Sequence, residues 1–191
     1  MELIEPFLKV FLLVFLAEFG DKSQLVCMTL SARYRATPVL VGSVLAFSVL
    51  NALAAVFGAA LSAYLPQTLI FFAVGLLFLI FGVQSFMAGD DEGEERVTVG
   101  KHLVVSVFVL IFLAELGDKT QLAIAGMAAV EQAWVVWLSG TIALVLTTVI
   151  GIGCGRVLLT RVPIALIHRG AGILFMLFAG IAFFQLYQSL I

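Results

Sequence analysis

Six apolar stretches, each about long enough to cross a lipid bilayer, dominate this chain. Crossing the ~30 Å hydrocarbon core takes about 20 helical residues. The composition agrees, since 63% of the 191 residues are hydrophobic, only 12% are charged and the mean hydropathy is +1.20. A water-soluble fold of this length cannot bury so much apolar surface, so lipid must be its solvent. We predict spans at Pro6–Leu30, Val39–Leu61, Leu69–Ala88, Leu103–Val130, Trp134–Leu158 and Ile164–Leu190.

The chain contains one unit twice. A shift of 97 positions lays Val10–Leu25 on Val107–Leu122, and twelve of the sixteen aligned positions are identical. Such self-similarity indicates a duplicated structural unit. We therefore predict a first three-helix repeat over residues 1–88, an acidic cytoplasmic linker over 89–101 and a second three-helix repeat over 102–191.

The number of spans in each unit fixes how the two units are related. Because three is odd, the second copy enters the membrane from the opposite side. The predicted fold class is thus an all-α polytopic membrane protein with six transmembrane helices in two inverted three-helix repeats. Many secondary transporters have this architecture and bind their substrate where the halves meet, although a membrane enzyme can also be built this way.

The basic residues predict the orientation. Seven of them lie in the connections after the first, third and fifth spans, and all three connections fall on one side of the membrane: Arg33, Arg35, Arg96, Lys101, Arg156, Arg161 and Arg169. The opposite side offers only Lys9. By the positive-inside rule the basic side is cytoplasmic, so both termini are expected to face outward.

Charges deep within the spans carry the functional signal. Glu18 lies twelve residues after Pro6, which is ~18 Å along a helix and close to the bilayer centre. Placing one charged side chain there costs at least ~2.5–3.5 kcal/mol, so a cluster of them needs a compensating partner. Only two short segments hold such charges, and the residues are Glu18, Asp21, Lys22, Glu115, Asp118 and Lys119.

These residues predict a binding site for a divalent cation. On a continuous helix, Glu18 and Asp21 share a face because they are three residues apart, and the inverted symmetry brings them to Glu115 and Asp118. Four carboxylates and two lysines leave a charge of −2, which one divalent ion neutralises. We predict the four acids as metal ligands. The charge-balancing residues are Lys22 and Lys119.

Neighbouring polar and small residues complete the predicted site. Two glycines lie between the paired acids, where each permits either close approach of helices or a local helix break: Gly20 and Gly117. The candidate accessory ligands are Ser23, Gln24, Thr120, Gln121, Asn51 and Thr148. For the last two, an interhelical hydrogen bond is the favoured alternative to metal ligation.

Oxygen ligands alone suit the hard cations calcium, magnesium and manganese. Met28 and Met127 lie one to two turns further on, where a soft contact would favour manganese, although core packing is the favoured interpretation. The site also has a structural alternative, in which two buried ion pairs only lock the halves together. Those pairs would be Glu18–Lys22 and Glu115–Lys119, and they leave the aspartates unexplained.

Two copies of the pattern E-x-G-D-[KR]-[ST], one in each half, resemble a known family of cation transporters. The family includes bacterial manganese exporters and Golgi and chloroplast transporters for manganese and calcium. The resemblance covers nearly the whole chain, and both copies match at every defined position. It implies transport of Mn²⁺ (or Ca²⁺) out of the cytoplasm or into a compartment, against protons. No long N-terminal targeting extension is seen, which is similar to the bacterial members and implies the bacterial inner (plasma) membrane.

The functional prediction is therefore a secondary transporter of divalent cations. The favoured form is a Mn²⁺ exporter that works by alternating access and is coupled to protons. A Ca²⁺/H⁺ antiporter is the first alternative. A membrane lipid-pyrophosphate phosphatase and an ion channel are more remote, because no arginine clamp adjoins the acids and four clustered acids would hold an ion too tightly to conduct. We expect no catalysis, no cofactor and no nucleic-acid partner. The sequence leaves the oligomeric state undecided, and a homo-oligomer is one possibility.

Overall fold

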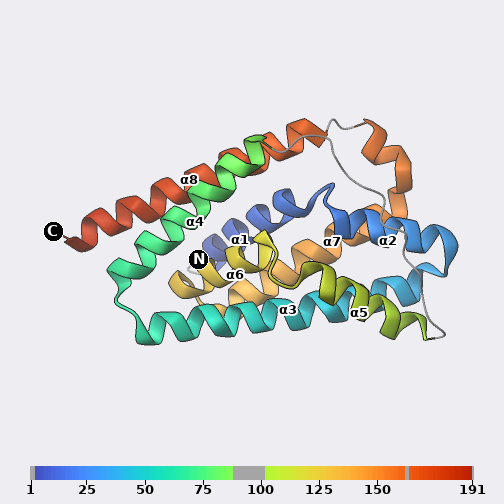
Figure 1. The fold of residues 1–191 in the computed structure, drawn as a ribbon, viewed down its shortest axis with the longest axis horizontal. Coiled ribbons are helices and arrows are strands. Elements are labelled where there is room, and N and C mark those ends of the chain that lie inside the picture. Colours follow the sequence, from blue (N-terminus) through green and yellow to red (C-terminus); the bar gives the residue numbers. More distant parts are fainter. Residues whose placement is uncertain (1–2, 88–101, 162–163, 191) are drawn as a thin grey trace.

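The structure is a computed structural model that describes residues 3–87, 102–161 and 164–190. The side chains of residues 22, 25, 32 and 154–168 lie outside this description, as does the predicted linker at 89–101. The described chain forms eight helices: α1 (Ile4–Glu18), α2 (Lys22–Arg33), α3 (Ala36–Tyr64), α4 (Gln67–Met87), α5 (Leu103–Glu115), α6 (Lys119–Val130), α7 (Ala133–Arg161) and α8 (Ile164–Leu190). The all-helical prediction is confirmed, and both halves present their helices in the same order (Figure 1).

Four of the described helical segments are long and apolar enough to cross a membrane alone: Ala36–Tyr64, Gln67–Met87, Ala133–Gly153 and Arg169–Leu190. The first and fourth predicted spans are different, because neither is one continuous helix. In each, the chain leaves the helix at the central glutamate and begins a second helix at the lysine of the motif. The predicted spans over 6–30 and 103–130 therefore each contain a helix break, which was one of the two options that the sequence left open at the motif glycines.

The breaks occur where glycine adopts a backbone conformation that other residues avoid. Gly20 has φ +85° and Gly117 has φ +82°, and they are the only described residues with positive φ. This left-handed region costs an L-residue with a Cβ roughly 1–2 kcal/mol. A Cβ added at either glycine meets nothing within 4 Å. Of the two roles considered for these glycines, the structure thus supports the helix break rather than close helix approach.

Close approach occurs instead on α3. A Cβ added to Gly58 would lie 2.0 Å from the backbone oxygen of Ala125 in α6, and one added to Gly42 would lie 2.7 Å from the backbone oxygen of Val104 in α5. Helix α3 of the first half therefore packs against both pieces of the broken helix in the second half. Helix α7 does the same for α1 and α2, so each broken helix is held by the other half.

The two remaining helices, α4 and α8, pair with each other across the two halves. Helices α4 and α8 pack along each other, and Figure 1 shows them above α1 and α6. Their buried residues belong to the same hydrophobic core as those of the other helices. Phe78 and Phe81 of α4 meet Phe175 of α8 with ring centroids 5.9 and 5.7 Å apart. The two breaks differ in burial, because Gly20 of the first is buried whereas Leu116 and Gly117 of the second are exposed.

Candidate metal site

The same short turn joins the helices at both breaks. The backbone N–H of Asp21 donates to the carbonyl of Glu18 at 3.1 Å, and the N–H of Asp118 donates to the carbonyl of Glu115 at 3.1 Å. Each glutamate ends a helix and each aspartate follows the glycine, so the two acids of one motif lie on a turn. The expectation that they share a face of one helix is wrong, because the positive φ of the glycine redirects the chain between them.

The turns bring acids from both halves together. Glu18, Asp21 and Asp118 each place a carboxylate oxygen so that the three oxygens lie within 4.8 Å of one another. Three oxygens at this separation can bind one cation that takes oxygen ligands at 2.0–2.6 Å. Glu115 is buried at 7% exposure but does not join this group among the described residues. The structure therefore assembles three of the four acids predicted as metal ligands.

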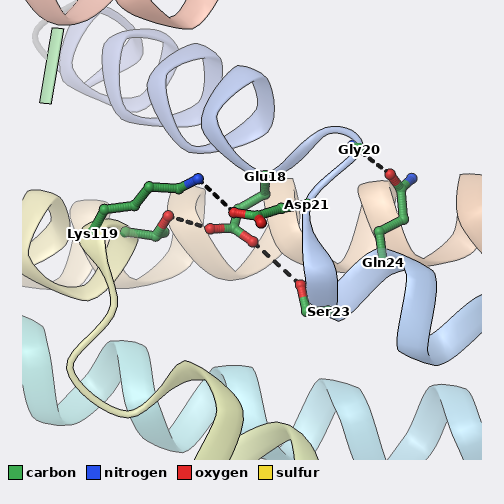
Figure 2. Close-up of polar contacts among 7 residues, drawn as sticks. Glu18, Gly20, Asp21, Ser23, Gln24 and Lys119 are labelled. Carbon is green, nitrogen blue, oxygen red and sulfur yellow. Dashed lines mark hydrogen bonds and ion pairs between the residues drawn. The ribbon is translucent and has the colours of Figure 1, made fainter. Parts of the chain in front are cut away.

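Glu18 is the most deeply placed member of the group, with 1% of its surface exposed. Ser23 of its own half donates a hydrogen bond to Oε2 at 3.3 Å, and Thr120 of the other half donates one to Oε1. Two residues expected as accessory ligands thus hold this carboxylate from opposite halves. Figure 2 shows the Glu18 carboxylate between the Ser23 hydroxyl and the start of α6.

A lysine from the second half also contacts the group. The Nζ of Lys119 lies 2.6 Å from Oδ2 of Asp21 (Figure 2). The alternative in which Lys119 pairs with Glu115 of its own motif is wrong, because the ion pair joins the two halves. The side chain of Lys22, the other residue expected to balance charge, lies outside the described part of the chain.

The two glutamines of the motifs have a role that the sequence reasoning missed. Gln24 accepts a hydrogen bond from the backbone N–H of Gly20 at 2.6 Å, and Gln121 accepts one from Gly117 at 2.8 Å. Gln24 also donates to the carbonyl of Thr147 in α7 at 2.7 Å. The signal was present in the sequence, since each glycine is followed four residues later by a glutamine.

The two candidates that lie outside the motifs, Asn51 and Thr148, form different kinds of hydrogen bond. Asn51 of α3 donates to the hydroxyl of Thr141 in α7 at 3.1 Å, which confirms the favoured interhelical hydrogen bond. Thr148 instead donates to the carbonyl of Leu144 in its own helix at 2.8 Å, so the interhelical interpretation is wrong there. Hydroxyl side chains inside helices commonly bond back to the preceding turn. Met127 belongs to the apolar core at 3% exposure, in agreement with the packing interpretation.

An acidic group at the meeting point of two broken helices, inside an otherwise apolar bundle, defines a helical membrane protein of the ion-transporter class. The sequence profile of the family described as divalent cation/proton antiporter GDT1 matches the chain twice, over residues 6–93 and 103–190. The chain belongs to the GDT1 family of divalent cation/proton antiporters.

Several curated proteins are similar to the chain over most of their length. A Vibrio cholerae protein named "Putative manganese exporter" is 32% identical over 87% of this chain and 84% of its own. A GDT1-like protein from Synechocystis is 31% identical over 88% and 91%. The "Divalent cation/proton antiporter GDT1" of Saccharomyces cerevisiae is 24% identical over 97% and 86%. No solved structure matches the chain.

Proposed function

We propose that this protein exports Mn²⁺ from the cytoplasm in exchange for protons, by alternating access to the acidic group described above. The observation that carries the proposal is the convergence of three carboxylate oxygens within 4.8 Å, drawn from both halves of the chain. Hard oxygen ligands are compatible with Mn²⁺, and the Vibrio cholerae relative is named for manganese export.

The proposed architecture has six crossings in two inverted repeats. Helices α1 and α2 contain 15 and 12 residues, which rise about 22 and 18 Å. Neither spans ~30 Å of hydrocarbon alone, whereas the two in succession are long enough. Helices α5 and α6 have 13 and 12 residues and the same relation. Each broken pair thus counts as one crossing with its acids near the midplane, as in transporters built from discontinuous helices.

Both halves supply ligands, so relative motion of the halves changes the access to the ion. In the proposed cycle the four acids Glu18, Asp21, Glu115 and Asp118 bind Mn²⁺ from the cytoplasmic side, and Glu115 joins the other three as the halves close. The halves then rock and release the ion outward. Protons that bind the emptied carboxylates offset their charge on the return step. Both termini face outward in this scheme, in the inner membrane of a bacterium.

The decisive experiment uses purified protein in liposomes. Uptake of Mn²⁺, Ca²⁺ and Mg²⁺ is measured with and without an imposed pH gradient, and release of inorganic phosphate from lipid pyrophosphates is followed in parallel. We expect saturable Mn²⁺ transport that depends on the pH gradient, and no phosphate release. Faster transport of Ca²⁺ than of Mn²⁺ would favour the Ca²⁺/H⁺ alternative, to which oxygen ligands are equally suited. Phosphate release would reject the transporter.

A further inference from the structure

The ammonium of Lys119 already lies where a transported cation would bind. Its Nζ is 2.6 Å from Oδ2 of Asp21, and a carboxylate oxygen of Asp21 lies within 4.8 Å of oxygens from Glu18 and Asp118. Figure 2 shows the lysine side chain directed at the acids from the side of α6. The negative charge of Asp21 is therefore paired with a cation that belongs to the protein itself.

This contact crosses between the halves. Lys119 is the first residue of α6 and directly follows Asp118, whereas Asp21 belongs to the turn between α1 and α2. The side chains of Lys119 and Asp21 are 33% and 20% exposed, so neither is sealed into the core. A lysine ammonium on its flexible four-carbon stem can leave Asp21 without movement of the backbone.

A divalent ion and this ammonium compete for Asp21 because both are positively charged. They repel each other, and the repulsion is strong in a site only partly open to water. We propose that Lys119 is a tethered competitor of the transported ion: its ammonium occupies Asp21 in the empty carrier, is displaced when the metal binds, and returns to help expel the metal. The proposal rests on the proposed function, because it takes Asp21 as a ligand of the transported ion.

A competitor and a merely structural ion pair predict opposite changes in metal affinity. If the pair only holds the two halves together, its removal loosens the acidic group and weakens binding. If Lys119 competes with the metal, its removal leaves Asp21 to the metal and tightens binding. The tighter binding then slows release, so the maximal rate of transport falls while the affinity rises.

The test compares Lys119→Gln with wild type and with Arg33→Gln, which removes an equal charge from the exposed end of α2. Mn²⁺ binding is measured by calorimetry on purified protein, and transport in liposomes. We expect the dissociation constant of Lys119→Gln to fall at least about tenfold, the effect of removing one nearby like charge. Its maximal transport rate should fall as well, and Arg33→Gln should match wild type in both measurements. Unchanged or weaker binding by Lys119→Gln would overturn the proposal.

A second measurement needs no variant, and so it does not depend on how Lys119→Gln folds. Wild-type protein is treated with an amine-acetylating reagent in the presence and absence of Mn²⁺, and modification is quantified by mass spectrometry. Displacement of the ammonium by the metal predicts faster acetylation of Lys119 when Mn²⁺ is present. Lys9, which pairs with Glu5 at 2.8 Å and Glu131 at 3.8 Å, is the internal reference. Equal or slower acetylation of Lys119 contradicts the proposal.

The outcome separates this inference from the proposed function. If wild-type protein neither binds nor transports Mn²⁺, the proposed function itself fails, and the role of Lys119 fails with it. If wild type transports Mn²⁺ but Lys119→Gln does not bind it more tightly, the transporter stands and only the competitor role is rejected.

Discussion

The side-chain oxygen of Gln24 accepts a hydrogen bond from the backbone N–H of Gly20 at 2.6 Å, and this contact closes the break between α1 and α2. The second half repeats it between Gln121 and Gly117 at 2.8 Å. The two contacts differ in burial: Gln24 is 2% exposed, whereas the contact of Gln121 lies in an exposed region. A buried N–H without a partner costs far more than an exposed one. The hydrogen bond of Gln24 should therefore contribute more to the stability of the protein than that of Gln121.

We predict that Gln24→Leu destabilises the protein by about 1–3 kcal/mol, because it leaves the buried N–H of Gly20 and the carbonyl of Thr147 without this partner. Gln121→Leu should cost clearly less, since water can replace its side chain. Denaturant or thermal unfolding in detergent measures both, with Gln67→Leu at the exposed start of α4 as the control. Equal losses for the two motif glutamines would contradict the difference in burial.

The conformation of the motif glycines gives a second prediction. Gly20→Ala should destabilise the protein by roughly 1–2 kcal/mol, because alanine pays the steric cost of positive φ although its Cβ has open space. Gly180→Ala is the matched control, since this helical glycine in α8 also has open space but no positive φ. There alanine should be neutral or stabilise by up to about 1 kcal/mol. Similar results for both variants would show that the left-handed turn is not required.

Much of this arrangement was accessible from the sequence, and the reasons for the exceptions are physical. The duplicated motif identified the acids, because charge in apolar segments is costly unless it has a partner. Hydropathy could not reveal the breaks, since the glycine and its neighbours lie within stretches that are apolar on average. Glycine permits both a turn and close packing, and only the backbone distinguishes Gly20 from Gly58.

The partner of Lys119 was equally hidden from the sequence. Spacing along one helix favours the nearby Glu115, and only the packing of the two halves brings Asp21 within 2.6 Å. Contacts between segments that are distant in sequence depend on the tertiary arrangement, which an internal repeat suggests but does not determine. The pair Glu115–Lys119 could therefore be judged only from the structure, and the pair Glu18–Lys22 stays a prediction because the side chain of Lys22 lies outside the described part of the chain.

The packing of α3 on α6 gives a third prediction. A Cβ on Gly58 would lie 2.0 Å from the backbone oxygen of Ala125, so Gly58→Ala forces the helices apart. Such overpacking typically costs 1–3 kcal/mol, and we expect about that loss in the free energy of unfolding. Because α6 begins at Lys119, transport should fall as well. An unfolding curve identical to wild type would show that α3 and α6 do not approach this closely.

Thr120 offers a test of the link between the halves at Glu18. Thr120→Val keeps the shape of the side chain but removes the hydroxyl that donates to the buried carboxylate. Hydrogen bonds to charged groups contribute about 1.5–3 kcal/mol, so the loss should appear in stability, in Mn²⁺ affinity, or in both. Thr120→Ser retains the hydroxyl and should stay near wild type. Unfolding and calorimetric titration of the two variants make the comparison, and equal behaviour would rule out a role for the hydroxyl.

The aspartates carry the most direct test of the proposed ion site. Asp21→Asn and Asp118→Asn each remove one negative charge from the three-carboxylate group while keeping the size of the side chain. Loss even of an outer-shell partner of a metal typically costs 10–100-fold in affinity or activity, so loss of a direct ligand should lower Mn²⁺ transport by at least about 100-fold. Membrane insertion should persist, because a neutral side chain is less costly in lipid than a charged one.

The control for the aspartates is Glu5→Gln, which removes an acid whose side chain is 73% exposed and which pairs with Lys9 rather than with the motif. It should transport at the wild-type rate. Manganese accumulation is followed in cells that express each variant at equal membrane levels, and again in liposomes. Because Asp21 and Asp118 come from opposite halves, both must be required if one ion is shared between them. Wild-type export by either aspartate variant would therefore show that the two halves do not bind a common ion.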